Sequence, residues 1–190
     1  LEALYHTRPA ERVKGAAQAA YAESRKELLA LLEHEAAQDL STVGAVWRSA
    51  AGDGFGLPAL LRRAAGRFEA VETDDVKRPT VLLVGEIYVR CDPFSSDFIV
   101  EKLEARGLRV RFAPFNEWIE YTDFDNAMNH GEGSAGKRIA NAVRGRIQER
   151  LYRAIAEPLG WPDRTSVKDS LKAAEGYLKS TLSGEAVLVE

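Results

Sequence analysis

The apolar run VLLV, residues 81–84, constrains the fold of this chain more than any other stretch. It shows no polar alternation, which predicts a short strand covered on both faces, as in a parallel sheet. Ser95 or Ser96 can cap a helix after it, and Gly107 can end that helix in a left-handed conformation. Residues 108–112 alternate apolar side chains with arginines, which predicts a second strand with one less covered face. This order predicts a βαβ unit with parallel strands.

The residues before this unit favour helices. Three are predicted, at residues 12–38, 41–47 and 58–70. The first is rich in alanine and leucine, and the leucines of residues 28–32 predict an apolar face at helical spacing. Ser41 or Thr42 can cap the second helix, and Pro58 suits the first turn of the third.

The residues after Pro114 predict two more helices and a third strand. A basic helix is predicted at 134–157, a last helix ends near Leu182, and the strand EAVLVE covers 185–190. The fold class predicted from the whole chain is α/β, with a Rossmann-like three-layer βαβ core of parallel strands and an α-helical N-terminal segment. We expect two parts, a helical segment at residues 1–75 and the Rossmann-like domain at 76–190.

Composition excludes several classes of protein. The 190 residues are 45% apolar and 29% charged, which is typical of a globular domain. The net charge of −3 gives no general attraction to nucleic acid or to an anionic membrane, so neither is expected as a partner. A single cysteine rules out an internal disulfide framework and favours a reducing, cytoplasmic compartment.

Two motifs have a plain structural interpretation. The stretch GEGSAGK, residues 131–137, matches a phosphate-binding loop, but Arg138 stands where a serine or threonine should follow and no strand precedes it. We interpret it as a glycine-rich helix start. The helix after it carries basic side chains from Lys137 to Arg153, which favour a solvated face. The alternative is a docking surface for an acidic or phosphate-bearing partner.

The sequence predicts no metal site. A zinc site or an iron–sulfur cluster needs about four ligands, whereas Cys91 is alone and His6, His34 and His130 lie on separate segments. An inert thiol is therefore the favoured interpretation of Cys91.

The loops after the two strands are the candidate ligand site. Ligands of open α/β sheets bind beyond the carboxyl ends of the strands, where polar and aromatic side chains converge. The candidate residues on the two loops are Glu86, Tyr88, Arg90, Asn116, Glu117 and Trp118. Asp92 follows on the first loop. The alternative is structural: Glu86 pairs with Arg90, and Asn116 caps a helix.

Residues 78–124, and above all GEIYVR, PFS and NEWIEYT, resemble a known family. They are similar to the C-terminal region of large acyl-CoA dehydratase activase-related proteins, the 2-hydroxyglutaryl-CoA dehydratase and CoA-substrate-specific enzyme activase family. The segment LYHTRPAE at residues 4–11 is similar to the part that leads into this region.

The resemblance implies a parent protein that uses ATP and a [4Fe-4S] cluster to deliver an electron to a dehydratase acting on 2-hydroxyacyl-CoA. Neither cofactor is expected in this chain itself, which has neither the actin-like ATPase part nor the cysteine-bearing segments. The implied partners are the remaining domains of the parent, a dehydratase component or an acyl-CoA. The chain starts without methionine and stops in a predicted strand, so we expect a fragment that is truncated at the C-terminus and inactive alone.

Overall fold

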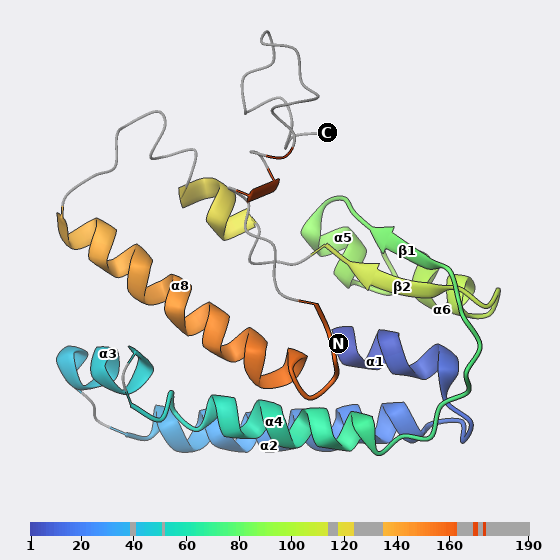
Figure 1. Ribbon diagram of the computed structural model, residues 1–190, viewed down its shortest axis with the longest axis horizontal. Helices are drawn as coiled ribbons and strands as arrows, with labels where there is room; N and C mark the ends of the chain where they lie inside the picture. The colour runs from blue at the N-terminus through green and yellow to red at the C-terminus, as the bar shows by residue number, and fades with distance from the viewer. Residues whose placement is uncertain are drawn as a thin grey trace, which may run out of the picture. The chain divides into compact units, whose positions relative to one another are not determined.

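The computed structural model describes residues 1–38, 41–50, 52–113, 118–123, 135–162, 169–170 and 173 (Figure 1). Two compact units are distinguished, Leu1–Ala113 with Val143–Pro162, and Pro114–Ala142 with Asp163–Glu190. The described part is mostly helical and contains a two-stranded parallel sheet. It is therefore mixed α/β without a full Rossmann-like core. The predicted third strand at Glu185–Glu190 lies outside the described residues.

The predicted βαβ unit is present in the first unit. Strand β1 (Thr80–Leu83) pairs in parallel with β2 (Arg109–Phe112), and Thr80 lies opposite Arg109. Val110 is 2% exposed whereas Arg111 is exposed, which confirms that β2 has one less covered face. Leu82 of β1 is also exposed, so the prediction that both faces of β1 are covered is wrong for the described structure.

The connection between the strands differs from the single predicted helix. It contains two short helices, α5 (Ile87–Cys91) and α6 (Ile99–Glu104). The Asp92 carboxylate accepts a hydrogen bond from the Ser95 backbone N–H at 2.7 Å, which holds the chain in a turn. Ser95 and Ser96 therefore lie in that turn and do not cap α6. The prediction for Gly107 is confirmed, since its φ of 76° is left-handed just after α6.

The remaining helices are α1 (Glu2–Thr7), the 3₁₀ helix η1 (Arg8–Ala10), α2 (Ala16–Ala36), α3 (Thr42–Ala50), α4 (Leu57–Glu69) and α8 (Ala135–Ala156). They include four that the sequence predicts, α2, α3, α4 and α8, and two that it does not predict, α1 and η1. Ser41 caps α3 by accepting a hydrogen bond from the Gly44 N–H at 3.1 Å, and Pro58 lies in the first turn of α4, as predicted. The α2 helix begins at a cap that the sequence did not reveal. Buried Glu11 accepts hydrogen bonds from the N–H groups of Gly15 and Ala17 at 2.9 and 2.8 Å.

Small side chains form much of the contact between α2 and α4, which lie antiparallel and side by side (Figure 1). Ala17 and Ser24 are the buried residues of α2, whereas Leu29 and Leu32 are exposed. The predicted leucine face is therefore only partly correct. The core cluster consists of Ala3, Leu4, Ala17 and Phe68, packed by aromatic and aliphatic side chains of α1, α2 and the end of α8.

An ion pair connects the N-terminal helices to the βαβ unit. Arg8 Nε donates to Glu104 Oε2 at 2.8 Å, across 96 residues of sequence. The Arg8 guanidinium also lies over the Tyr5 ring, and that ring packs on Phe112 of β2 with centroids 5.2 Å apart. Burial raises the pKa of Glu104, and the neighbouring Arg8 opposes that rise. Arg8 Nη2 and Glu104 Oε1 are buried without hydrogen-bond partners, so the pair fixes orientation more than it adds net stability.

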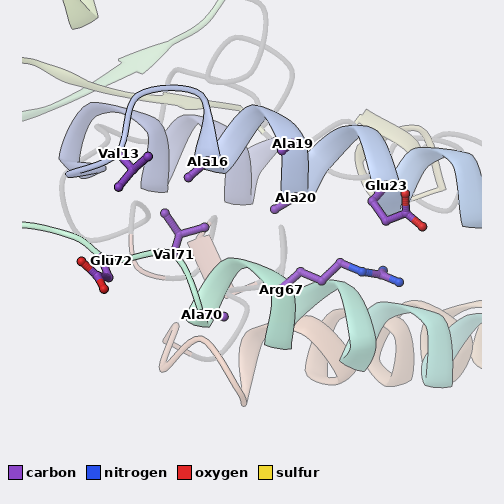
Figure 2. Close-up of a pocket in the computed structure, with 9 residues that line it drawn as sticks. All are labelled: Val13, Ala16, Ala19, Ala20, Glu23, Arg67, Ala70, Val71 and Glu72. Atoms are coloured by element: carbon purple, nitrogen blue, oxygen red, sulfur yellow. The ribbon is translucent and has the colours of Figure 1, made fainter.

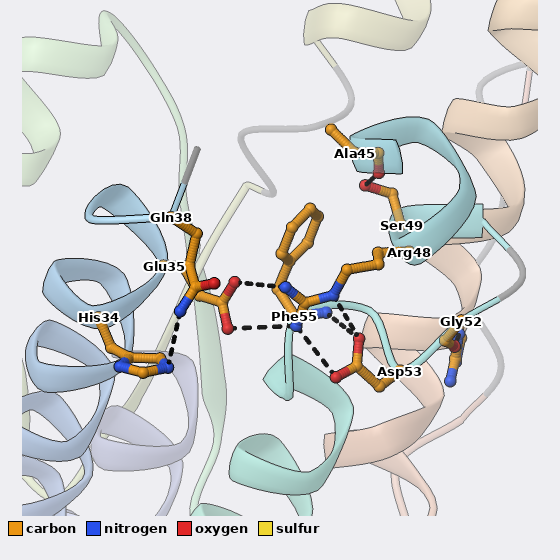
Figure 3. Close-up of polar contacts among 10 residues, drawn as sticks. His34, Glu35, Gln38, Ala45, Arg48, Ser49, Gly52, Asp53 and Phe55 are labelled. Atoms are coloured by element: carbon orange, nitrogen blue, oxygen red, sulfur yellow. Dashed lines mark hydrogen bonds and ion pairs between the residues drawn. The ribbon is translucent and has the colours of Figure 1, made fainter. Parts of the chain in front are cut away.

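A second charged cluster fixes the connection between α2, α3 and α4 (Figure 3). Arg48 of α3 donates to both carboxylate oxygens of Glu35 at 2.8 and 3.2 Å, and to Asp53 at 3.2 and 3.1 Å. Its guanidinium lies 4.7 Å from the Phe55 ring centroid. Phe55 has a φ of 56° and its N–H donates to Asp53, so the cluster stabilises a left-handed turn that most residues avoid.

The Arg8–Glu104 pair leads to a pH-dependent prediction. Arg8→Ala should lower the free energy of unfolding by about 2–3 kcal/mol at pH 7, because it leaves a buried carboxylate without its cation. The pKa of Glu104 then rises further, so the folded variant takes up a proton above the pH at which the unfolded chain does. Its stability should recover as the pH falls from 7 to 5. Urea unfolding at both pH values checks this, with exposed Arg106→Ala as control. An equal deficit at both pH values would contradict it.

The Arg48 cluster leads to a second stability prediction. Arg48→Ala should lower the Tm by several degrees, because Glu35, Asp53 and Phe55 all lose their common partner. Arg48→Lys should be intermediate, since an ammonium keeps the charge but cannot present the planar fork. Differential scanning calorimetry measures both, with exposed Arg25→Ala of α2 as the matched control. A Tm for Arg48→Ala equal to that of Arg25→Ala would show that the cluster contributes nothing.

Candidate functional site

The loop after β1 places the first three predicted site residues at the carboxyl end of the strand. Gly85 has a φ of 123°, a conformation that favours glycine, and it turns the chain from β1 into α5. Glu86 is the N-cap of α5, and its carboxylate accepts a hydrogen bond from the Val89 N–H at 2.8 Å. The backbone N–H groups of Val89 and Tyr88 hold the pKa of Glu86 below its usual value, with a smaller effect from Arg90. Glu86 therefore holds the loop in place as an ionised cap.

Arg90 is the cation of this loop. The structure contains no ion pair between the Glu86 carboxylate and the Arg90 guanidinium, so the alternative in which these two residues pair is not observed. Arg90 is half-buried, and its Nε is buried without a hydrogen-bond partner within the described ranges. A buried guanidinium donor that lacks an acceptor costs free energy. An anionic group that accepts a hydrogen bond from Arg90 would remove that cost.

Aromatic residues lie close to Arg90 in the sequence, and their side chains are exposed to solvent. Tyr88 is 69% exposed and Phe94 is 84% exposed, and about half of Phe98 is exposed as well. Asp97 and Phe98 have φ values of 52° and 53°, which is an unusual conformation for two successive residues that are not glycine. Leu82 and Val84 continue the exposed apolar surface onto the end of β1. The loop thus presents apolar rings together with one arginine.

The second predicted loop is only partly described. Asn116 and Glu117 lie outside the described residues, and so does the proposed helix cap by Asn116. Trp118 begins a helical segment at 118–123 and is 57% exposed. It belongs to the second unit, so the convergence of the two loops stays a prediction.

The thiol and the described carboxylates and imidazoles form no metal site. Cys91 is free and exposed, and no group of three metal-ligating side chains occurs among the residues that the structure describes. The prediction that no strand precedes GEGSAGK stays untested, because residues 131–134 are not described. Within the described helices, none is long and apolar enough to cross a bilayer.

The basic helix α8 is partly engaged within the molecule. Arg150 donates to the Gly52 carbonyl at 2.8 Å, and Arg153 pairs with Glu149 at 2.6 Å. Arg144 and Arg146 are exposed on the same helix. Some basic side chains of α8 therefore make contacts within the molecule, and the solvated face stays a prediction.

An open groove of about 570 Å³ lies between the start of α2 and the end of α4 (Figure 2). Its walls combine small apolar side chains, including Ala16, Ala20 and Val71, with the charged residues Glu23, Arg67 and Glu72. Arg67 at its edge is already bonded to Glu27 at 2.7 Å. No set of polar groups converges there, so the groove lacks the features of a small-molecule site.

A smaller and more enclosed cavity is not predicted by the sequence. It has a volume of about 170 Å³ and lies at the start of the two strands, lined among others by His6, Arg109 and Arg111. The alternation of arginines in β2 is a sequence signal for this cavity, but by itself it predicts only that one face of the strand is exposed. The contribution of α1, about a hundred residues away, could not be seen from spacing alone.

Comparisons with protein families, with curated proteins and with solved structures find no match to this chain. The family suggested by residues 78–124 therefore stays a prediction, and a proposal of function depends on the geometry described above.

Proposed function

We propose that the loop from Gly85 to Phe98 forms one wall of an acyl-CoA site in a protein related to 2-hydroxyacyl-CoA dehydratases and their activases. The observation that carries the proposal is the combination of Arg90, which has a buried donor without an acceptor, with exposed Tyr88 and Phe94 at the end of a parallel strand. The ligand class follows from chemistry. Coenzyme A offers phosphates to a guanidinium, and an adenine ring that can stack on aromatic side chains.

The finer fold belongs to the same proposal. We propose a Rossmann-like three-layer domain in which β1 and β2 are joined by the predicted third strand at Glu185–Glu190. Asn116, Glu117 and Trp118 stay further candidates for ligand binding in this proposal. The [4Fe-4S] cluster and ATP of the proposed parent would be held elsewhere, because this chain has one cysteine.

The second candidate function is a docking module that meets a dehydratase component through α8. Exposed Arg146 favours it. The intramolecular contacts of Arg150 and Arg153 reduce the surface available. Association with that component should weaken as salt is raised and after the double reversal Arg144→Glu and Arg146→Glu. Binding that responds to neither change, measured by biolayer interferometry, would count against docking.

Calorimetric titration of the chain tests the acyl-CoA proposal. Free CoA and an acyl-CoA should bind saturably, with ATP as the comparison ligand. Arg90→Ala should weaken CoA binding about ten- to hundredfold, since a charge-assisted hydrogen bond contributes about 1.5–3 kcal/mol. Phe94→Ala should also weaken it, by loss of a stacking surface.

Arg106→Ala is the matched control, because Arg106 is exposed and donates only to the Lys102 carbonyl within its own helix end. It should leave the affinity for CoA unchanged. If none of the three ligands binds, the proposal is contradicted. Equal loss in Arg90→Ala and Arg106→Ala would reduce the interaction to general charge attraction, and equal affinity for ATP and CoA would indicate a nucleotide site instead.

A further inference from the structure

The enclosed cavity at the start of the strands is independent of the proposed acyl-CoA site. Thr80 and Arg109 are the first residues of β1 and β2, and Arg90 follows the opposite end of β1 (Figure 1). All residues that line the cavity belong to the first unit. The cavity therefore requires its own explanation.

The cavity wall carries more positive than negative charge. Arg109 and Arg111 are its two cations, and His6 of α1 lies in the same wall. Glu2 is the one carboxylate in the wall, and Arg111 Nε lies 3.3 Å from its Oε1. No carboxylate of the described residues remains for Arg109.

Arg109 is the group that most needs a ligand. Its Nε is buried and has no hydrogen-bond partner, and no ion pair of its side chain is found in the part of the chain that the structure describes. A buried guanidinium donor without an acceptor loses its hydration and gains nothing in return. An anion in the cavity would supply the missing acceptor.

The walls are held in position before any ligand arrives. His6 packs on Trp161 with ring centroids 5.9 Å apart, and the Tyr152 hydroxyl donates to the Pro162 carbonyl at 2.7 Å. Arg109 and Arg111 are two residues apart in a strand, so their side chains leave the same face of the sheet. Two forked cations are thus directed from one rigid element.

We propose that this cavity binds a phosphate group, with Arg109 as the principal donor and with Arg111 and His6 beside it. The volume suits that ligand. Its volume of about 170 Å³ is many times the roughly 10–15 Å³ that one ordered water needs, so the cavity has room for phosphate or for the terminal group of a phosphomonoester. Paired arginines favour such an anion because each can donate two parallel hydrogen bonds to its oxygens.

Binding should be linked to proton uptake at His6. Burial lowers the pKa of His6, and the nearby positive charges of Arg109 and Arg111 lower it further. The other titratable groups of the wall are Glu2 of α1 and Tyr152 of α8. A bound phosphate would offset the two guanidinium charges and raise the pKa of His6, so affinity should increase as the pH falls toward 6.

The test is an NMR titration of the whole chain with inorganic phosphate and, separately, with methyl phosphate. The Arg109 Nε–H and His6 ring signals should shift saturably, and the pKa of His6 should rise by at least half a unit when phosphate is saturating. Chloride and acetate at equal ionic strength serve as comparison ions. Binding of inorganic phosphate alone would identify the free ion as the ligand, and binding of both would identify a phosphoryl group.

Arg109→Met removes the proposed donor while keeping the length of the side chain. It should weaken phosphate binding at least tenfold and leave the Tm equal or higher, because it also removes the buried donor without a partner. A purely structural role for Arg109 predicts a lower Tm instead. Exposed Arg106→Ala should bind phosphate like the parent chain. If Arg109→Met fails to fold, the pKa of His6 in the unaltered chain decides, and an unchanged value in saturating phosphate overturns the proposal.

Discussion

The Arg8–Glu104 ion pair is the interaction on which the arrangement of the first unit depends. It joins the 3₁₀ turn after α1 to the helix that precedes β2, and Tyr5 packs on Phe112 beside it. By holding α1 against β2, the pair brings Glu2 and His6 to the start of the strands. Two atoms of the pair lack partners, so it contributes little net free energy and mainly selects one orientation.

Local signals in the sequence were sufficient where a few neighbouring residues decide the structure. The VLLV run, Pro58 and Ser41 each act within one turn or one strand, and the strand and helix boundaries follow them. The crossover was predicted less well because Asp92 competes for the backbone and folds Ser95 into a turn. The same limit explains α2, where burial of Ala17 and Ser24 depends on α4, and the leucines contribute less than their spacing suggests.

The two candidate sites show different degrees of predictability. Glu86, Tyr88 and Arg90 could be chosen because the end of a parallel strand is a known place for ligands, and that end is visible in the sequence. The sequence could not show that Glu86 is occupied as a helix cap, which leaves Arg90 and the aromatic rings for recognition. The cavity of Arg109 needs α1, β2 and the end of α8 together. Only tertiary structure brings these three segments to one point.

Arg90 and Arg109 share one physical property at opposite ends of the sheet. Each has a buried Nε that finds no acceptor among the described residues. A chain of 190 residues can replace such an arginine with methionine or leucine at little cost to packing, and doing so would remove a desolvation penalty. The two buried Nε atoms are therefore not explained by stability. An anionic ligand at each end, as we propose, would supply an acceptor and convert the penalty into binding free energy. At each site, replacing the arginine should therefore weaken ligand binding without lowering the stability of the fold.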